Sequence, residues 1–190
     1  AFKSDLEMKG FTANRDIVLE TKNGQGKITL SGTLNMNGHK FVSDGNLTLS
    51  SGEINLNGGA MEVRGKMITN GTMSINKGTM KVEGNLIHES GTLKVGGGKL
   101  EVDGDYRMQK ENVDTVGKIS YTYGIGTLYM TNDNDYVLIN GEFVDESQNS
   151  MTGKLTAGTM EVKGNFTQKN GSYSNFDTSG THTVILSGTE

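Results

Sequence analysis

Residues 78–104, GTMKVEGNLIHESGTLKVGGGKLEVDG, contain the pattern that decides the fold. Glycine recurs there every six or seven residues, at Gly78, Gly84, Gly91, Gly98 and Gly104. Between the glycines, apolar and polar side chains usually alternate, as in the segment Lys-Leu-Glu-Val that follows Gly98. This period of two is typical of a β-strand and is incompatible with a helix.

Every third glycine marks a longer repeat of 19 or 20 residues, at Gly26, Gly45, Gly65, Gly84 and Gly104. Each turn of about 20 residues therefore has three arms, with a glycine at each corner. Access to positive φ would let glycine turn the chain sharply there. One turn buries too little apolar surface to be stable alone, so the turns must stack. The sequence predicts an all-β parallel β-helix, or β-solenoid, with three strands per turn, and leaves its handedness open.

The side chains agree with this register. On the outside, Glu62, Lys81 and Glu101 take the same place in successive turns and alternate in charge, which favours stacking. The neighbouring column of Arg64, Glu83 and Asp103 ends in two acids and matches less well. Six of the ten methionines are predicted to fill the core from inward positions, and these are Met36, Met61, Met73, Met80, Met130 and Met160.

One solenoid domain is predicted over residues 1–190, in four parts. These are an entry segment (1–25), regular turns (26–108), an irregular insertion (109–125) and further turns (126–190). Residues 180–188 look like an arm entering another turn, and the chain starts at Ala1 without an initiator methionine. We therefore expect a fragment of a longer array, in which flanking repeats stack end to end.

Composition excludes several classes of protein. The chain has 28 glycines, no proline and no cysteine, which excludes collagen, disulfide scaffolds, thiol catalysis and cysteine zinc sites. A net charge of -4 with interspersed signs predicts no binding to nucleic acid, and no apolar run is long enough for membrane insertion. No motif for a nucleotide or another cofactor is present, so we expect none.

With these residues in hand, the chain resembles the parallel β-helix arrays of large bacterial secreted and cell-surface proteins, including filamentous-haemagglutinin-like adhesins. The resemblance covers residues 26–108 and 126–188 and rests on turn length, corner glycines and alternating apolar positions. It implies an extracellular scaffold or adhesive role, by analogy of fold. Hexapeptide acyltransferases do not fit, because many glycine gaps are seven residues long. The calcium-binding nonapeptide roll does not fit either, because the stretch 96–100 lacks its aspartate.

The insertion and the residues after it hold the candidate ligand-binding site. Four of the six tyrosines fall between residues 121 and 136, and two aspartates accompany them. Exposed tyrosines beside carboxylates could stack on sugar rings or contact a protein, although the rings could also cover a disturbed part of the core. The predicted set is Tyr121, Tyr123, Tyr129, Asp133, Asp135 and Tyr136.

Other polar groups are given structural roles. Asp103 and Asp105, together with Asp133 and Asp135, could bind calcium or act as acid and base, but aspartate is an ordinary turn residue and the EF-hand pattern is missing. His39, His88 and His182 lie far apart in sequence, so we expect each to be solvated or packed individually. We therefore predict no metal site and no catalytic residue.

Two functions remain open at this stage. The first is a non-catalytic structural or adhesive module, secreted or at the cell surface, which contacts a glycan or a host or cell-surface protein. The second is a carbohydrate-binding or polysaccharide-degrading β-helix, which needs clustered acids on adjacent turns. Ice binding is disfavoured, because the column of Thr72 and Thr92 includes Glu53.

Overall fold

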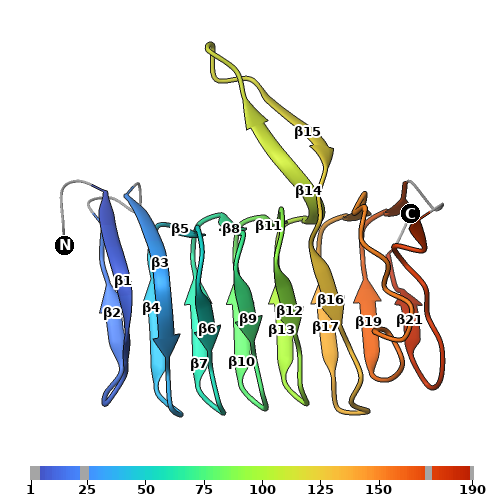
Figure 1. The fold of residues 1–190 in the computed structure, drawn as a ribbon, viewed down its shortest axis with the longest axis horizontal. Helices are drawn as coiled ribbons and strands as arrows, with labels where there is room; N and C mark the ends of the chain where they lie inside the picture. The colour runs from blue at the N-terminus through green and yellow to red at the C-terminus, as the bar shows by residue number, and fades with distance from the viewer. Residues whose placement is uncertain (1–4, 22–25, 170–172, 189–190) are drawn as a thin grey trace.

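The structure is a computed structural model that describes residues 5–21, 26–169 and 173–188. It is a parallel β-solenoid with turns of about 20 residues, which confirms the predicted fold. Figure 1 shows the turns stacked into a straight rod from the N-terminal to the C-terminal end. Residues 1–4 and 22–25 of the predicted entry segment, and 170–172 and 189–190 of the last turns, lie outside the described residues.

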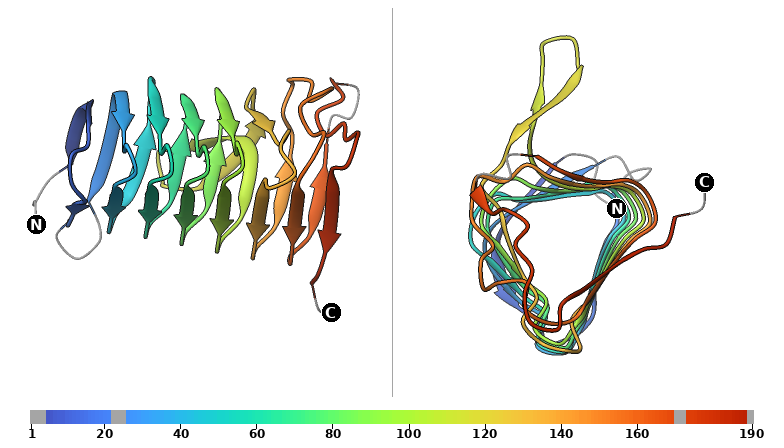
Figure 2. Two further views of the ribbon diagram at one scale, coloured as in Figure 1. Left: turned by 90° about the horizontal axis from the view of Figure 1, so that it is seen from below. Right: turned by 90° about the vertical axis from the view of Figure 1, so that its right-hand side faces the viewer.

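Seen along its axis, the rod is a triangle with three faces (Figure 2). The first face contains β5 (Asn46–Leu49), β8 (Met67–Thr69), β11 (Leu86–His88), β14 (Tyr106–Val113), β18 (Phe143–Asp145) and β20 (Phe166–Gln168). The second contains β6 (Glu53–Asn55), β9 (Thr72–Ser74), β12 (Thr92–Lys94) and β16 (Thr127–Tyr129). The longer strands β1 (Leu6–Thr12) and β3 (Lys27–Asn35) bend across the corner and belong to both faces.

The third face is an eight-stranded parallel sheet. Its strands are β2 (Ile17–Leu19), β4 (Lys40–Ser43), β7 (Ala60–Val63), β10 (Thr79–Val82), β13 (Lys99–Val102), β17 (Tyr136–Ile139), β19 (Thr159–Val162) and β21 (Thr183–Leu186). Because β1 and β2 pair with β3 and β4, solenoid turns already begin at Leu6, inside the predicted entry segment. In the described ranges no helical segment has the length and hydrophobicity that a membrane span requires.

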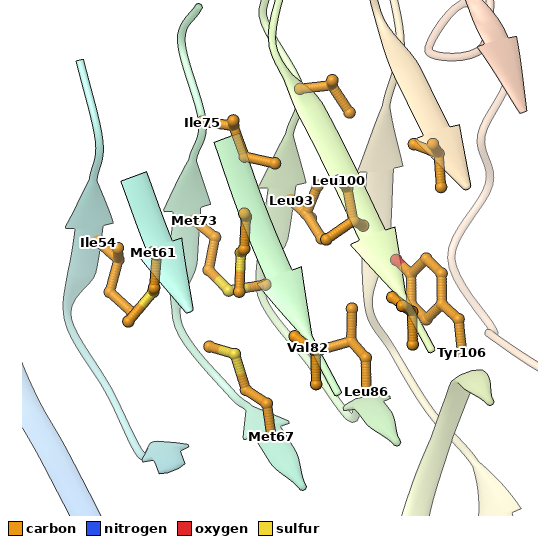
Figure 3. Packing of buried hydrophobic residues seen from close by; sticks show 14 of the residues in the cluster. Ile54, Met61, Met67, Met73, Ile75, Val82, Leu86, Leu93, Leu100 and Tyr106 are labelled. Carbon is orange, nitrogen blue, oxygen red and sulfur yellow. The ribbon is translucent and has the colours of Figure 1, made fainter. Parts of the chain in front are cut away.

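The core is one continuous column inside the triangle, as Figure 3 shows for its middle turns. All six methionines predicted to point inward are buried, so the predicted register is confirmed. Along the first face, one inward row changes from aliphatic to aromatic when Leu86 is followed by Tyr106, Phe143 and Phe166. The rings of Tyr106 and Phe143 lie 5.4 Å apart and those of Phe143 and Phe166 lie 5.2 Å apart.

The predicted reason for the corner glycines is only partly right. The glycine at the corner between the third and first faces, represented by Gly84, does not have positive φ. A Cβ on Gly84 would instead lie 2.7 Å from the carbonyl oxygen of Gly65, one turn earlier. Close stacking of backbone on backbone therefore requires glycine there. Positive φ occurs elsewhere, as at Asn57 and Gly58, between the second and third faces.

The predicted charge columns pair between turns. Lys81 lies opposite Glu62 on one side and Glu101 on the other, and its Nζ is 3.1 Å from a Glu101 carboxylate oxygen. The same Nζ lies 3.0 Å from Asp103, which brings the two columns together. These half-buried carboxylates and the exposed Lys40 form ion pairs at the surface of the rod, where each pair adds little stability.

Candidate functional site

The predicted insertion is an ordered β-hairpin that leaves the rod. Where earlier turns bend from the first face into the second, β14 continues to Val113 and β15 (Ile119–Tyr123) returns antiparallel to it. Figures 1 and 2 show the hairpin projecting from the edge of an otherwise uniform rod. The rod resumes at β16, which pairs directly with β12 of the previous turn.

Local hydrogen bonds order the hairpin from its tip downward. At the tip, an oxygen of the Asp114 carboxylate accepts bonds from the backbone N–H of Val116 at 2.9 Å and Lys118 at 2.8 Å. Gly117 supplies the positive φ of 80° that this turn needs. Lower down, the Asn112 side-chain amide donates to the Thr122 hydroxyl at 3.1 Å. The tip is therefore a defined turn.

Three contacts hold the hairpin base against the first face. The Glu111 carboxylate forms an ion pair with Lys66, and the backbone N–H of Glu111 donates to the Glu89 carboxylate at 3.1 Å. The Arg107 guanidinium lies 4.8 Å from the centre of the Tyr121 ring. This is close enough for a cation–π interaction, which orients the half-buried ring toward the rod. These contacts fix the orientation of the hairpin relative to the rod.

The hairpin and the residues just after it expose apolar side chains. The exposed fractions are 59% for Val113, 85% for Val116, 48% for Ile119, 53% for Tyr123 and 50% for Ile125. On the rod, large inward side chains are almost completely covered. An apolar group gathered on one projecting element is typical of a binding surface.

Two shallow depressions flank the hairpin base. One of about 310 Å³ is lined by Asn70, Glu89, Ser90, Lys110, Tyr123, Gly124 and Ile125. The other, of about 270 Å³, is lined by Lys27, Asn46, Thr48, Lys66, Ile68, Glu111 and Val113. In the first depression the Glu89 carboxylate accepts from the Asn70 amide at 3.0 Å, so its orientation is fixed. An exposed aromatic ring thus lies beside oriented polar groups.

The six sequence-predicted residues do not form one group. Tyr121 and Tyr123 share one face of the hairpin, as expected from their spacing. Tyr129 lies on β16 of the second face, with the Nζ atoms of Lys94 and Lys154 5.9 and 5.5 Å from its ring centre. Tyr136 lies on β17 of the third face. Only the first two belong to the projecting element.

Tyr136 and the two aspartates are engaged within the rod. The Tyr136 hydroxyl donates to the Glu161 carboxylate at 2.6 Å, and this bond raises the pKa of Tyr136 to about 12. Asp133 accepts a bond from the Thr181 hydroxyl at 3.0 Å.

Asp135 is almost fully buried and closes the corner between the second and third faces. Its carboxylate accepts backbone N–H bonds from Gly97 at 2.5 Å, Thr131 at 2.8 Å and Asn132 at 3.0 Å. These bonds join two successive turns, which is a structural role.

Asp103 and Asp105 are also paired. Asp103 contacts Lys81 and accepts from the Asn140 amide at 2.8 Å. Asp105 accepts from Arg107 at 2.8 Å and from the Glu142 backbone at 3.0 Å. Among the described residues, no three histidine, cysteine, aspartate or glutamate side chains are grouped as metal ligands.

Sequence reasoning missed a set of buried polar side chains inside the solenoid. His88 is fully buried, and its Nδ1 lies 3.0 Å from the Tyr106 hydroxyl. Burial lowers the pKa of His88 to about 4, so the ring is neutral at pH 7, and burial also raises the pKa of Tyr106. Burial likewise raises the pKa of Asp145 to about 7, although its carboxylate accepts bonds from Ser147 and Asn175. The repeat could have located Tyr106, which follows Leu86 by one turn, but Asp145 lies opposite Met108 and two turns from His88.

The chain matches no protein-family model, no curated protein and no solved structure. The functional assignment therefore depends on geometry. The His88 imidazole and the Asp145 carboxylate lie inside the core, so neither is accessible to a ligand. The accessible chemistry of the hairpin is aromatic, apolar and hydrogen-bonding, which is suited to binding.

Proposed function

We propose that this chain is a non-catalytic solenoid rod that displays the hairpin β14–β15 as a binding element, in a secreted or cell-surface protein. The observation that carries the proposal is the exposed apolar group of Val113, Val116, Ile119 and Tyr123 on the one hairpin that leaves the described rod. Loops and insertions on rigid scaffolds often carry recognition. The extracellular setting is inferred from the resemblance to the parallel β-helix arrays of bacterial secreted and cell-surface proteins.

The rod supports this role through its stiffness. Strands β7, β10 and β13 pair with the same register on both sides and without a bulge. The core beneath them is continuous over the described turns. Eight stacked strands at a spacing of about 4.8 Å span about 34 Å, so the hairpin is held at a fixed height on a rigid support.

The class of ligand that we favour is a glycan. The exposed Tyr123 ring can stack on the apolar face of a sugar, and Asn70, Glu89 and Ser90 line the same depression. A protein ligand would use the apolar tip, which Val113, Val116 and Ile119 form.

A hairpin-shortened variant tests the proposal. Lys110 and Thr122 are directly opposite each other, so an Asn-Gly turn can join them after residues 111–121 are removed. The labelled chain and this variant are applied to an array that carries glycans and purified extracellular-matrix proteins. We expect binding by the chain, loss of at least about tenfold in the shortened variant, and a similar loss for Tyr123→Ala on glycans.

Tyr173→Ala is the matched control, because Tyr173 is also exposed but lies outside the hairpin. It should bind as the unmodified chain does. Absence of any bound ligand, or full binding by the hairpin-shortened variant, would contradict display by the hairpin. Glycan binding that survives Tyr123→Ala would reject the sugar-stacking role of that ring.

A further inference from the structure

The strand β15 has an unpaired outer edge. Glu111 lies opposite Tyr121, and the Glu111 N–H points away from β15 because it donates to Glu89. Directly opposite residues of an antiparallel pair direct their backbone groups either toward each other or outward together. The N–H and C=O of Tyr121 therefore point outward, and by alternation so do those of Ile119 and Tyr123.

These outward groups have no partner in the described part of the chain. The backbone of Ile119–Tyr123 forms no hydrogen bond outside the β14–β15 pair. The opposite edge of the hairpin differs, because the Glu89 carboxylate occupies the N–H of Glu111. A further strand can therefore pair with the hairpin along the outer edge of β15.

The composition of β15 does nothing to prevent such pairing. Edge strands are usually protected by charge, proline or a bulge, but Ile119–Tyr123 reads Ile-Ser-Tyr-Thr-Tyr and has none of these. Its isoleucine, threonine and tyrosines favour strands. The facing strand β14 does carry charges, at Lys110 and Glu111.

The same five residues are complementary to themselves in the antiparallel direction. With Tyr121 at the centre, Tyr121 meets Tyr121 of a second copy, and Ile119 meets Tyr123 at both ends. Ser120 then meets Thr122 on the other face. Aromatic pairs, aromatic–β-branched pairs and hydroxyl pairs are the cross-strand combinations that stabilise antiparallel sheets.

We propose that β15 is a homodimerisation edge, which pairs antiparallel with β15 of a second copy to form a four-stranded sheet. The pairing is two-fold symmetric, so the interface closes and does not propagate. Because the hairpin projects from the rod, the two rods lie at opposite ends of the shared sheet (Figure 1). This inference goes beyond display, since it assigns the backbone edge of the hairpin to a second copy.

Charge exchange at the paired hydroxyls tests the register. Ser120→Lys with Thr122→Lys places lysine opposite lysine at both positions, and Ser120→Glu with Thr122→Glu places glutamate opposite glutamate. Each double variant should remain monomeric, whereas an equimolar mixture should recover the dimer because every lysine then faces a glutamate. Asn112→Lys is the control: it adds charge to the same hairpin face on β14 and should leave dimerisation intact.

Sedimentation equilibrium of the full chain from about 5 to 500 µM covers the range of weak, small interfaces. We expect the mass to double over this range and amide exchange at Ile119, Tyr121 and Tyr123 to slow at least about tenfold at high concentration. Ser120 and Thr122, already paired with β14, should change less. A monomer at every concentration overturns the proposal, as does a dimer that both double variants retain.

The amide pattern separates this dimer from other associations. End-to-end stacking of rods would raise the mass without slowing exchange at Ile119, Tyr121 and Tyr123, and that result also overturns the proposal. The variants are surface changes, and circular dichroism verifies that each remains folded. Glycan binding is measured separately, so failure of dimerisation leaves the display function standing and the reverse also holds.

Discussion

The regular turns (26–108) and the hairpin that interrupts the next turn obey different rules. On the rod, each residue stacks between equivalents 19 or 20 residues away, so neighbouring turns constrain its size, polarity and charge. In the hairpin, Ile119 and Tyr123 have β14 on one side only. Stacking explains a buried leucine of the rod but does not explain an exposed isoleucine at the hairpin. Exposed apolar residues are therefore informative about function there.

The largest effect that distinguishes the two regions is expected from a charge in the core. Met80→Asp buries a carboxylate with no partner and should lower the free energy of unfolding by about 4 kcal/mol or more, enough to unfold the chain at moderate temperature. Lys81→Gln, one residue along and pointing outward, should cost less than about 1 kcal/mol. Thermal and urea unfolding measure both. An unchanged midpoint for Met80→Asp would contradict the register.

The next prediction concerns the pH dependence of the free energy of unfolding, to which two buried titratable groups contribute with opposite signs. The pKa of Asp145 is raised from 3.8 to about 7. Its contribution to the free energy of unfolding is therefore complete below pH 4 and falls by about 4 kcal/mol as the pH rises toward 7. The pKa of His88 is lowered from 6.5 to about 4. Its contribution to the free energy of unfolding is therefore complete above pH 6.5 and falls by about 3 kcal/mol as the pH falls toward 4. The two slopes largely cancel in the unmodified chain.

Single substitutions should separate these slopes. For Asp145→Asn, the free energy of unfolding should rise from pH 4 to 6.5, because only the His88 contribution remains. For His88→Gln it should fall from pH 4 to 7. Urea unfolding at closely spaced pH values measures the slopes. Two variants with the same sign of slope would contradict the assigned burial of these groups.

A smaller effect tests why the rod needs glycine. In Gly84→Ala, the new Cβ would press on the backbone of Gly65, and we expect a loss of about 2 kcal/mol in unfolding free energy. Gly58→Asn is the comparison, because no atom lies within 4 Å of a Cβ there and Asn57 beside it already adopts positive φ. Its cost should be about 0.5 kcal/mol. Equal costs in chemical denaturation would contradict stacking as the reason for glycine at position 84, because Gly84 does not have positive φ.

The rod could be predicted from sequence because its two periods are both visible in the residue order. Alternation of two placed Met80 inward and Lys81 outward, and the repeat of 19 or 20 placed Lys81 beside Glu62 and Glu101. The contact at Gly84 could not be predicted, since the distance between stacked backbones is a property of three dimensions. The sequence pattern could only suggest that glycine was needed.

The candidate site was predictable only in part, because closeness in sequence is a poor guide inside a solenoid. Tyr121 and Tyr136 are 15 residues apart, yet one leaves the rod on the hairpin and the other lies on the third face. Asp135 looked like a member of the tyrosine group, whereas its carboxylate binds the N–H of Gly97 from the previous turn. That bond depends on how two corners stack, which no local motif encodes.

The smallest expected effect is the sharpest test of the two-region comparison. The hairpin-shortened variant loses the Glu111–Lys66 pair and the Arg107–Tyr121 contact, and it also loses the bond from the Glu111 N–H to Glu89. Since the ladders from β11 to β14 and from β14 to β18 remain, we expect a loss of only about 1 kcal/mol in unfolding free energy. Urea unfolding measures it, with Gly117→Asn as a control that retains the hairpin. A loss as large as that of Met80→Asp would mean that the hairpin is part of the folding unit, and its exposed residues would then need a structural explanation.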